Sequence, residues 1–299
     1  MAQHWDLMTS GEIGALVAGG LDLALLPVGA TEQHGPHLAT GCDTISPEEI
    51  ASRVSDETGV VVLPAIAYGI SLGHTTRWPG TLSLHPQTLI QVVLEIGRWV
   101  IGSGFSKLIM LNGNGPNSPA LECARIQLRY EFPRCRFRVL SLFDCSARVQ
   151  QHYFSDAADI HANRGETSLL MHVRPAAVRP QQRIDEDDVT VGRVFSYDMP
   201  ATTVSGVVGR PSLASPAEGA KLTQMLVEDI SAIVRTALEE EWPQPAAPQW
   251  SSPAWQAAEL RFHVSRPALR RLETRLDPAI MSQLDTVRQT HDARWNMFG

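Results

Sequence analysis

The sequence has 299 residues, of which 43% are hydrophobic and 19% are charged, as in a globular protein with a sizeable core. Its formal net charge of −7 comes without a block of Lys and Arg, which argues against nucleic acid or an anionic membrane as a partner. The N-terminus lacks a basic and apolar leader, no apolar run reaches the roughly 18 residues of a membrane span, and the four cysteines show no CxxC spacing. We therefore expect a reduced, cytoplasmic protein.

The first half of the chain alternates strand-length apolar runs with helical patterns. Residues 21–28 (LDLALLPV) predict a buried strand, and residues 60–66 predict a second one. Between them, Ser46-Pro47-Glu48-Glu49 has the pattern of a capping box with proline at the first helical position, which predicts a helix over residues 47–58. A further helix is predicted over residues 86–103 from its apolar periodicity.

The same alternation continues to residue 240. Residues 107–111 and 136–142 predict two more strands, with a helix that opens at Ser118 between them. A second capping-box pattern at Ser215 predicts a helix that reaches residue 240. The alternation indicates an α/β fold with a mostly parallel sheet covered on both faces, whose ligands bind at the carboxyl ends of the strands.

The composition changes after residue 243. Residues 242–256 (WPQPAAPQWSSPAWQ) are rich in Pro and Trp, and residues 267–289 predict a terminal helix. Proline interrupts continuous helix. We therefore expect residues 244–299 to form an extension that packs on the core or on a neighbouring subunit.

The loop after the first strand contains Glu32 and His34, with Asp43 further on. Two residues that are two positions apart in an extended segment point to the same side. Carboxylates and an imidazole form a mixed oxygen and nitrogen donor set that suits Zn²⁺, Mn²⁺ or Fe²⁺. The alternative is a polar turn whose charged side chains are only solvated.

Five motifs in order resemble those of the creatininase (creatinine amidohydrolase) family, over roughly residues 5–240. They are PVGATEQHGPHLATGCDT at residues 27–44, YG with a following histidine and WPGT at residues 68–81, NGNGPN at residues 112–117, HANRGETS at residues 161–168, and GVVGRP at residues 206–211. The resemblance implies a three-layer α/β/α sandwich over residues 1–243 and a metal centre of one or two ions.

The same resemblance implies roles for individual residues. Glu32 and His34 would each hold one ion, Asp43 would bridge them, and Glu166 would be the carboxylate on the far side. His161 would act as a general acid or base near the leaving nitrogen, since a departing amine needs a proton. The alternative for His161 is a histidine that only caps or packs at a helix end.

The sequence departs from the family pattern at two places. Asn114 stands where the family has a histidine ligand, and an amide oxygen is a weaker donor for zinc-like ions. The centre would then hold one ion loosely, hold a single ion, or prefer a harder ion. Arg164 stands where the family often has Glu, and it would bind an acidic substrate group or form an ion pair.

Other side chains are candidates for the substrate pocket. His37, His74 and Trp78 would face it, although Trp78 beside Pro79 is equally compatible with plain packing. Cys42 is expected to be a small buried residue, because no base is spaced to activate it as a nucleophile.

These features predict hydrolysis of a C–N amide bond, whether linear amide, cyclic amide or formamide, in a small molecule. Two alternatives stay open: a peptidase that trims a short peptide in an open groove, and a metal-poor descendant that binds a ligand without turnover. The family resemblance also implies a homo-oligomer, commonly a hexamer.

Overall fold

The computed structural model describes residues 1–157 and 160–243. The chain forms two compact units, of which the first comprises Met1–Leu128 and Cys135–Glu240 and the second comprises Arg129–Arg134 and Glu241–Gly299. All of the predicted extension at residues 244–299, with its helix at residues 267–289, lies outside the described residues.

A parallel sheet of five strands in the order β1-β3-β2-β4-β5 forms the centre of the first unit. Val28, Asn112 and Ser141 stand side by side at the ends of β2, β4 and β5. The polar segments that follow these strands therefore begin at the same edge of the sheet. The strands are β1 Gln3–His4, β2 Leu23–Val28, β3 Val61–Val62, β4 Lys107–Asn112 and β5 Arg136–Ser141.

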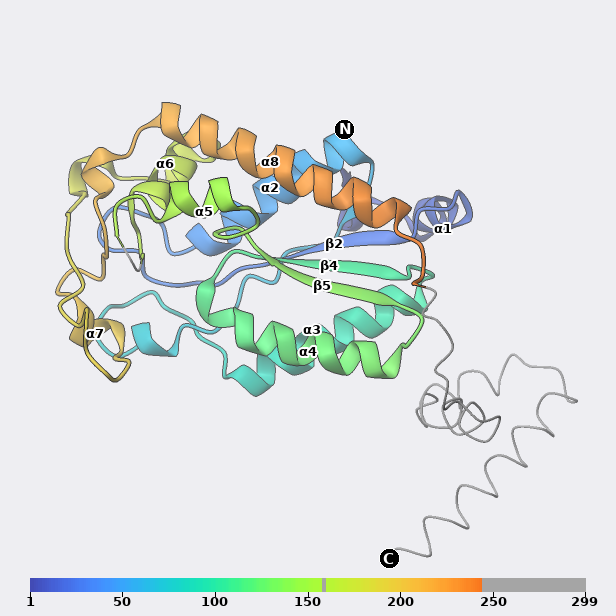
Figure 1. Ribbon diagram of the computed structural model, residues 1–299, viewed down its shortest axis with the longest axis horizontal. Helices are drawn as coiled ribbons and strands as arrows, with labels where there is room; N and C mark the ends of the chain where they lie inside the picture. The colour runs from blue at the N-terminus through green and yellow to red at the C-terminus, as the bar shows by residue number, and fades with distance from the viewer. Residues whose placement is uncertain (158–159, 244–299) are drawn as a thin grey trace, which may run out of the picture. The chain divides into compact units, whose positions relative to one another are not determined.

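Helices cover both faces of this sheet, so the predicted three-layer α/β/α sandwich is confirmed (Figure 1). One face is covered by α2 Cys42–Thr58, α5 Ala147–Tyr153, α6 Arg164–Val173 and α8 Pro216–Glu239, and the other by α3 Pro86–Gly102 and α4 Ser118–Glu131. Two further helices are α1 Ser10–Ala18 and α7 Met199–Thr202. Among the helices in the described part of the chain, none combines the length and apolar character that a membrane span needs.

The core between the sheet and helices α2 and α8 explains why the sequences of strands β2 and β4 are continuous apolar runs. Leu25 and Leu111 of the sheet pack in one buried cluster with Ile50 of α2 and with Leu226 and Ile230 of α8. Every residue of β2 and β4 is buried, because helices cover both of their faces. A substitution of one of these leucines by alanine would cost about 2–5 kcal/mol.

The predicted start of the helix over residues 47–58, which is α2 in the structure, was wrong. The helix begins at Cys42 rather than at Pro47, which lies inside it. Proline has no N–H and cannot donate to the carbonyl of the residue four positions earlier, which is Asp43. The missing bond would have joined the second turn of the helix to the first. The predicted strand at residues 60–66 shortens to β3, and Ile66 keeps only an isolated bridge to Val28.

Four helices were missed, of which α1, α5 and α6 have a local signal at their start and α7 has no side-chain cap. Thr9 and Glu12 form a reciprocal capping box at α1, and the Ser146 side chain accepts from the Val149 N–H at α5. At α6, Asn163 accepts from the N–H of Glu166 at 3.1 Å. A short polar residue at such a position satisfies a backbone donor that the helix leaves free.

Candidate metal centre

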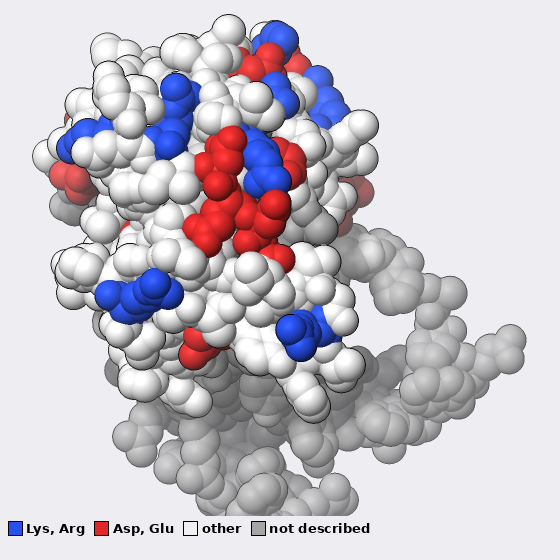
Figure 2. Space-filling view, turned by 90° about the vertical axis from the view of Figure 1, so that its left-hand side faces the viewer, with Lys and Arg blue, Asp and Glu red and all other residues white. Residues whose placement is uncertain are grey.

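The polar residues of the first motif lie at the carboxyl ends of the strands. Glu32 and His34 belong to the loop after β2, and Asp43 lies in the first turn of α2. His161 precedes α6 in an isolated bridge with Val208, and Glu166 lies in the first turn of α6. Figure 2 shows the surface at this end of the sheet, where acidic and basic side chains are mixed. The side chains of the cluster itself are buried.

Two glycines allow the first turn of α2, which carries Asp43, to lie close to the sheet. A Cβ on Gly29, after β2, would overlap the backbone of Asp43 and Thr44, and a Cβ on Gly113, after β4, would overlap the Asp43 carbonyl. The backbones of two neighbouring strands therefore approach the same turn from two sides. Because larger residues would push it outward, the position of Asp43 depends on glycine at both places.

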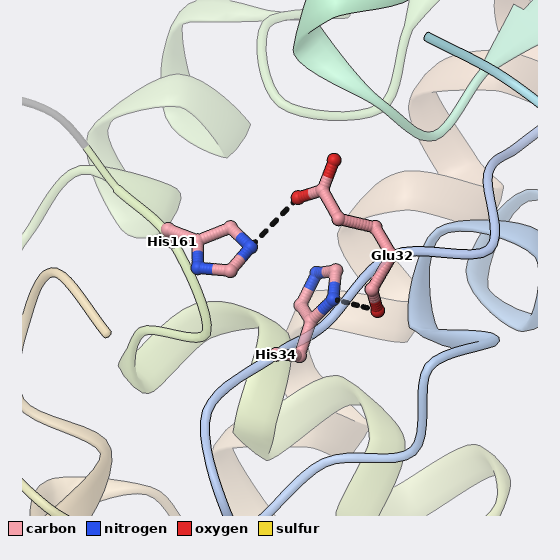
Figure 3. A group of neighbouring side chains, drawn as sticks. All are labelled: Glu32, His34 and His161. Atoms are coloured by element: carbon pink, nitrogen blue, oxygen red, sulfur yellow. Dashed lines mark hydrogen bonds and ion pairs between the residues drawn. The ribbon is translucent and has the colours of Figure 1, made fainter. Parts of the chain in front are cut away.

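Glu32 is the centre of one half of the cluster. Its Oε1 lies 2.8 Å from His161 Nε2 and 3.3 Å from His74 Nδ1. On the other side of the His161 ring, Nδ1 lies 2.5 Å from the Gly206 carbonyl oxygen, which can only accept, so Nδ1 carries a proton. This bond fixes the ring with Nε2 directed at the Glu32 carboxylate (Figure 3).

His34 is the centre of the other half. Its Nδ1–H donates to the Glu32 carbonyl at 3.0 Å (Figure 3), which leaves Nε2 as the nitrogen that faces the carboxylates. Nε2 lies 3.1 Å from Asp43 Oδ1 and 4.0 Å from Glu166 Oε1. A metal-binding histidine usually has its other ring nitrogen fixed in this way by a backbone carbonyl.

The donor set fits one or two divalent cations. The second oxygens of the three buried carboxylates, Glu32 Oε2, Asp43 Oδ2 and Glu166 Oε2, have no hydrogen-bond partner. A buried carboxylate oxygen without a partner is costly. Three carboxylates around His34 and His161 leave an excess of negative charge, which a divalent cation would neutralise.

The pKa shifts reflect this crowding of charges. Burial raises the pKa of Asp43 to about 6, although His34 partly offsets the effect. Burial opposes ionisation of Glu32 as well, but the hydrogen bond from His161 and the charges of the three neighbouring histidines together outweigh it and lower the pKa of Glu32 to about 2. Burial of the His34 ring favours its neutral form, but the interactions with Asp43 and Cys42 together outweigh it and raise the pKa of His34 well above the usual range.

Asn114 is buried at the end of the NGN turn. Its Nδ2 donates to the Ile70 carbonyl at 3.0 Å and lies 3.4 Å from Asn117 Oδ1. Asn117 in turn donates to the Gly29 carbonyl at 3.0 Å. The asparagines thus tie the loop after β4 to the loops after β2 and β3. Ligation of a metal by Asn114 Oδ1 stays a prediction.

Among the residues expected at the substrate, the two histidines are buried. His37 Nε2 lies 2.9 Å from the Thr167 hydroxyl, and burial lowers the pKa of His37 to about 4. His74 Nδ1 lies 2.9 Å from Gln33 Nε2, and burial, with His161 nearby, lowers the pKa of His74 to about 3. Both rings are therefore neutral near pH 7.

The other two such residues make contacts outside the cluster. The Arg164 guanidinium lies 3.5 Å from Glu218 of α8, which is the ion pair weighed as the alternative to substrate binding. Trp78 is half-buried, and the Arg77 guanidinium stacks on its ring at 5.4 Å. Substrate contacts by Arg164 and Trp78 stay predictions.

Sequence reasoning missed Gln33 at the centre, and it predicted that Cys42 is buried, which is confirmed, but not that Cys42 lies beside His34. Gln33 is buried, accepts from the Gly35 N–H at 2.9 Å and contacts His74, so it supports the loop from within. Cys42 forms a compact group with His34 and Asp43, in which the ligand atoms all lie within 4.8 Å of one another. Its position next to Asp43 was the available signal, but the wrong helix start hid that both lie in one helical turn.

Comparison with known proteins gives a consistent result. The family model for creatininase, creatinine amidohydrolase, matches residues 6–234. A mycofactocin precursor peptide peptidase of Mycolicibacterium smegmatis is 32% identical over 69% of this chain and 81% of its own length. A creatinine amidohydrolase of Pseudomonas putida is 31% identical over 79% of this chain and 96% of its own. A solved manganese form of creatininase has a TM-score of 0.71 at 29% identity, over 80% of this chain and 100% of that one.

Proposed function

The chain belongs to the creatininase family, and from that premise we propose that it is a metal-dependent hydrolase that cleaves a C–N amide bond in a small molecule. The observation that carries the proposal is the set of three buried carboxylates whose second oxygens have no partner. Glu32, His34, Asp43 and Glu166 would hold the metal. A bound divalent ion supplies a water of lowered pKa and polarises the carbonyl of the amide.

His161 has the geometry of the proton-transfer residue. Its Nδ1–H is held by the Gly206 carbonyl, so the ring cannot turn away from the centre. Its Nε2 is the nitrogen that can move a proton, and it faces the Glu32 carboxylate at 2.8 Å. Protonation of the leaving nitrogen by such a group is typically worth 10²–10⁴-fold in rate. We expect His161→Gln to lose activity on this scale while metal content is kept.

The burial of the centre supports a small substrate. His74 and His161 are at most 7% exposed, so a substrate that reaches them has to be narrow or partly enclosed. A second candidate, trimming of a short peptide, is favoured by the similarity to the mycofactocin precursor peptide peptidase. A panel of small amides, formamides and short peptides, with release of the amine as readout, separates the two.

Metal analysis tests the proposal directly. Protein purified without chelators should carry a divalent transition metal, and Asp43→Ala should lose most of it. Asp6→Ala, at an exposed position remote in sequence from the cluster, is the matched control and should keep the wild-type content. Equally low metal in all three proteins would contradict the proposal and would favour a metal-poor binding protein.

A further inference from the structure

Cys42 lies at the boundary between the proposed metal centre and an apolar cluster. It is the first residue of α2 and is 1% exposed. On one side it packs in a buried cluster with Leu38, Leu170 and Val207. On the other side its sulfur belongs to the group formed with His34 and Asp43. The thiol therefore has an apolar wall behind it and metal-binding side chains in front.

The two neighbours of the sulfur have buried atoms that point to a ligand. Asp43 Oδ2 and His34 Nε2 are both buried without a hydrogen-bond partner. Because His34 Nδ1 donates to the Glu32 carbonyl, Nε2 is the nitrogen directed at this group, where a cation would take the place of its proton. The atoms of the group lie within 4.8 Å of one another, and ligand atoms around a tetrahedral zinc lie roughly 3.5 Å apart. Small movements of these side chains would bring the three atoms from their present spacing to that of a tetrahedral zinc site.

We infer that Cys42 is a further metal ligand, which joins His34 and Asp43 and biases this half of the centre toward zinc-like ions. Thiolate is a soft donor that suits Zn²⁺ and Co²⁺, whereas Mn²⁺ and Mg²⁺ suit carboxylate and carbonyl oxygens. A thiol binds metal as thiolate, so its proton passes to solvent as the metal–sulfur bond forms. The apolar wall excludes water from the far side of the sulfur, which strengthens its attraction to a cation.

The inference rests on the proposed function. Cobalt substitution tests the ligand role of Cys42 and the existence of the metal centre separately. Co²⁺ bound by oxygen and nitrogen gives weak visible bands, and a thiolate adds an intense charge-transfer band in the near ultraviolet. The chain has three other cysteines, of which Cys123 is exposed and Cys135 and Cys145 are half-buried. A triple variant with serine at these three positions keeps Cys42 alone and serves as the matched control for Cys42→Ser.

We expect the charge-transfer band in wild type and in the triple variant, and its loss in Cys42→Ser with the weak visible bands kept. Visible bands without the charge-transfer band in wild type and in the triple variant would overturn the role of Cys42 and leave the metal centre intact. No uptake of Co²⁺ by either protein would overturn both the ligand role and the metal centre. The triple variant decides the question even if Cys42→Ser fails to fold.

Competition between metals supplies a second readout. We expect the preference for Zn²⁺ over Mn²⁺, measured by equilibrium dialysis against both ions, to fall by about tenfold or more in Cys42→Ser, because even outer partners of a metal site change affinity by about 10–100-fold. An unchanged preference in a folded Cys42→Ser protein would overturn the inference.

Discussion

Replacing Asp43 by asparagine should have opposite effects on stability without and with metal. Asparagine has nearly the same shape but no charge. In the metal-free protein, burial raises the pKa of Asp43, and the nearby charges of Glu32 and Glu166 add to this effect. The substitution removes the cost of ionising this buried carboxyl group. In the metal-loaded protein it removes a proposed ligand instead.

The size of the first effect follows from the pKa. Asp43 has a pKa of about 6 in the fold against 3.8 ordinarily, so the folded state resists its ionisation. This costs nothing below pH 4, where both states are protonated, and the full cost is present above pH 6. At 1.36 kcal/mol per pKa unit, the cost is on the order of 3 kcal/mol at pH 8. Metal-free Asp43→Asn should therefore be more stable than wild type by about this amount at pH 8.

Urea unfolding of chelator-treated wild type and Asp43→Asn at pH 8, 6 and 5 tests this prediction. The gain in the free energy of unfolding should shrink as the pH falls through 6. With Zn²⁺ at about 100 times its dissociation constant, wild type should gain about 2.7 kcal/mol and the variant much less. Asp6→Asn, at an exposed position, should change nothing.

A metal-free Asp43→Asn protein that is less stable than wild type at pH 8 would refute this reasoning. The carboxylate of Asp43 would then be held mainly by favourable bonds, such as the contact with His34, and the centre would not be short of positive charge.

Four further outcomes are expected. Asn114→His should tighten metal binding on the order of tenfold, and identical titrations of the two proteins would mean that residue 114 faces away from the metal. Gly219→Ala should cost about 1–3 kcal/mol of unfolding free energy, because its Cβ would overlap the Ser168 carbonyl. The control Gly14→Ala lies in open space within α1 and should stabilise the protein by up to about 1 kcal/mol. An unchanged melting temperature in Gly219→Ala would contradict the close packing of α6 on α8. Because His74 is neutral in the fold but protonated when unfolded, it destabilises the metal-free protein as the pH falls below about 6.5, in the direction opposite to Asp43. His74→Phe should therefore gain stability relative to wild type as the pH falls from about 6.5, and equal pH dependence of the two proteins in chemical denaturation would contradict this. The protein should be a homo-oligomer, and light scattering that gives a mass near the 32.8 kDa of one chain would refute this.

The fold was predictable from the sequence because both central strands are buried on two faces. Residues 23–28 and 107–112 have apolar runs that only such a position produces. The start of α2 was not predictable, because Ser46 and Pro47 carry a strong helix-start pattern that tertiary packing overrides. Gly29 and Gly113 pack closely against the turn before Pro47, and the sequence of residues 42–46 gives no signal of that contact.

The site was predictable in part. Glu32, His34 and Asp43 are close in sequence, and their spacing predicted that their side chains approach one centre; ligation of a metal there stays a prediction. Bringing Glu166 to 4.0 Å from His34 depends on how α6 packs, which periodicity alone does not give. Arg164 illustrates the limit: its partner Glu218 lies on α8, and a pair so distant in sequence leaves no local signal.

Pro47 divides α2 into two parts with separate tasks. The N–H that would tie the body of the helix back to Asp43 does not exist, so the turn at residues 42–46 is linked to the rest of α2 by fewer hydrogen bonds. That turn carries Cys42 and Asp43, whereas the residues after Pro47, such as Ile50 and Val54, build the core. Local opening of the turn need not melt the helix. If the proposed centre holds a metal, this turn can open to exchange it, and the side chains at residues 42 and 43 can change in evolution, while the core built after Pro47 stays packed.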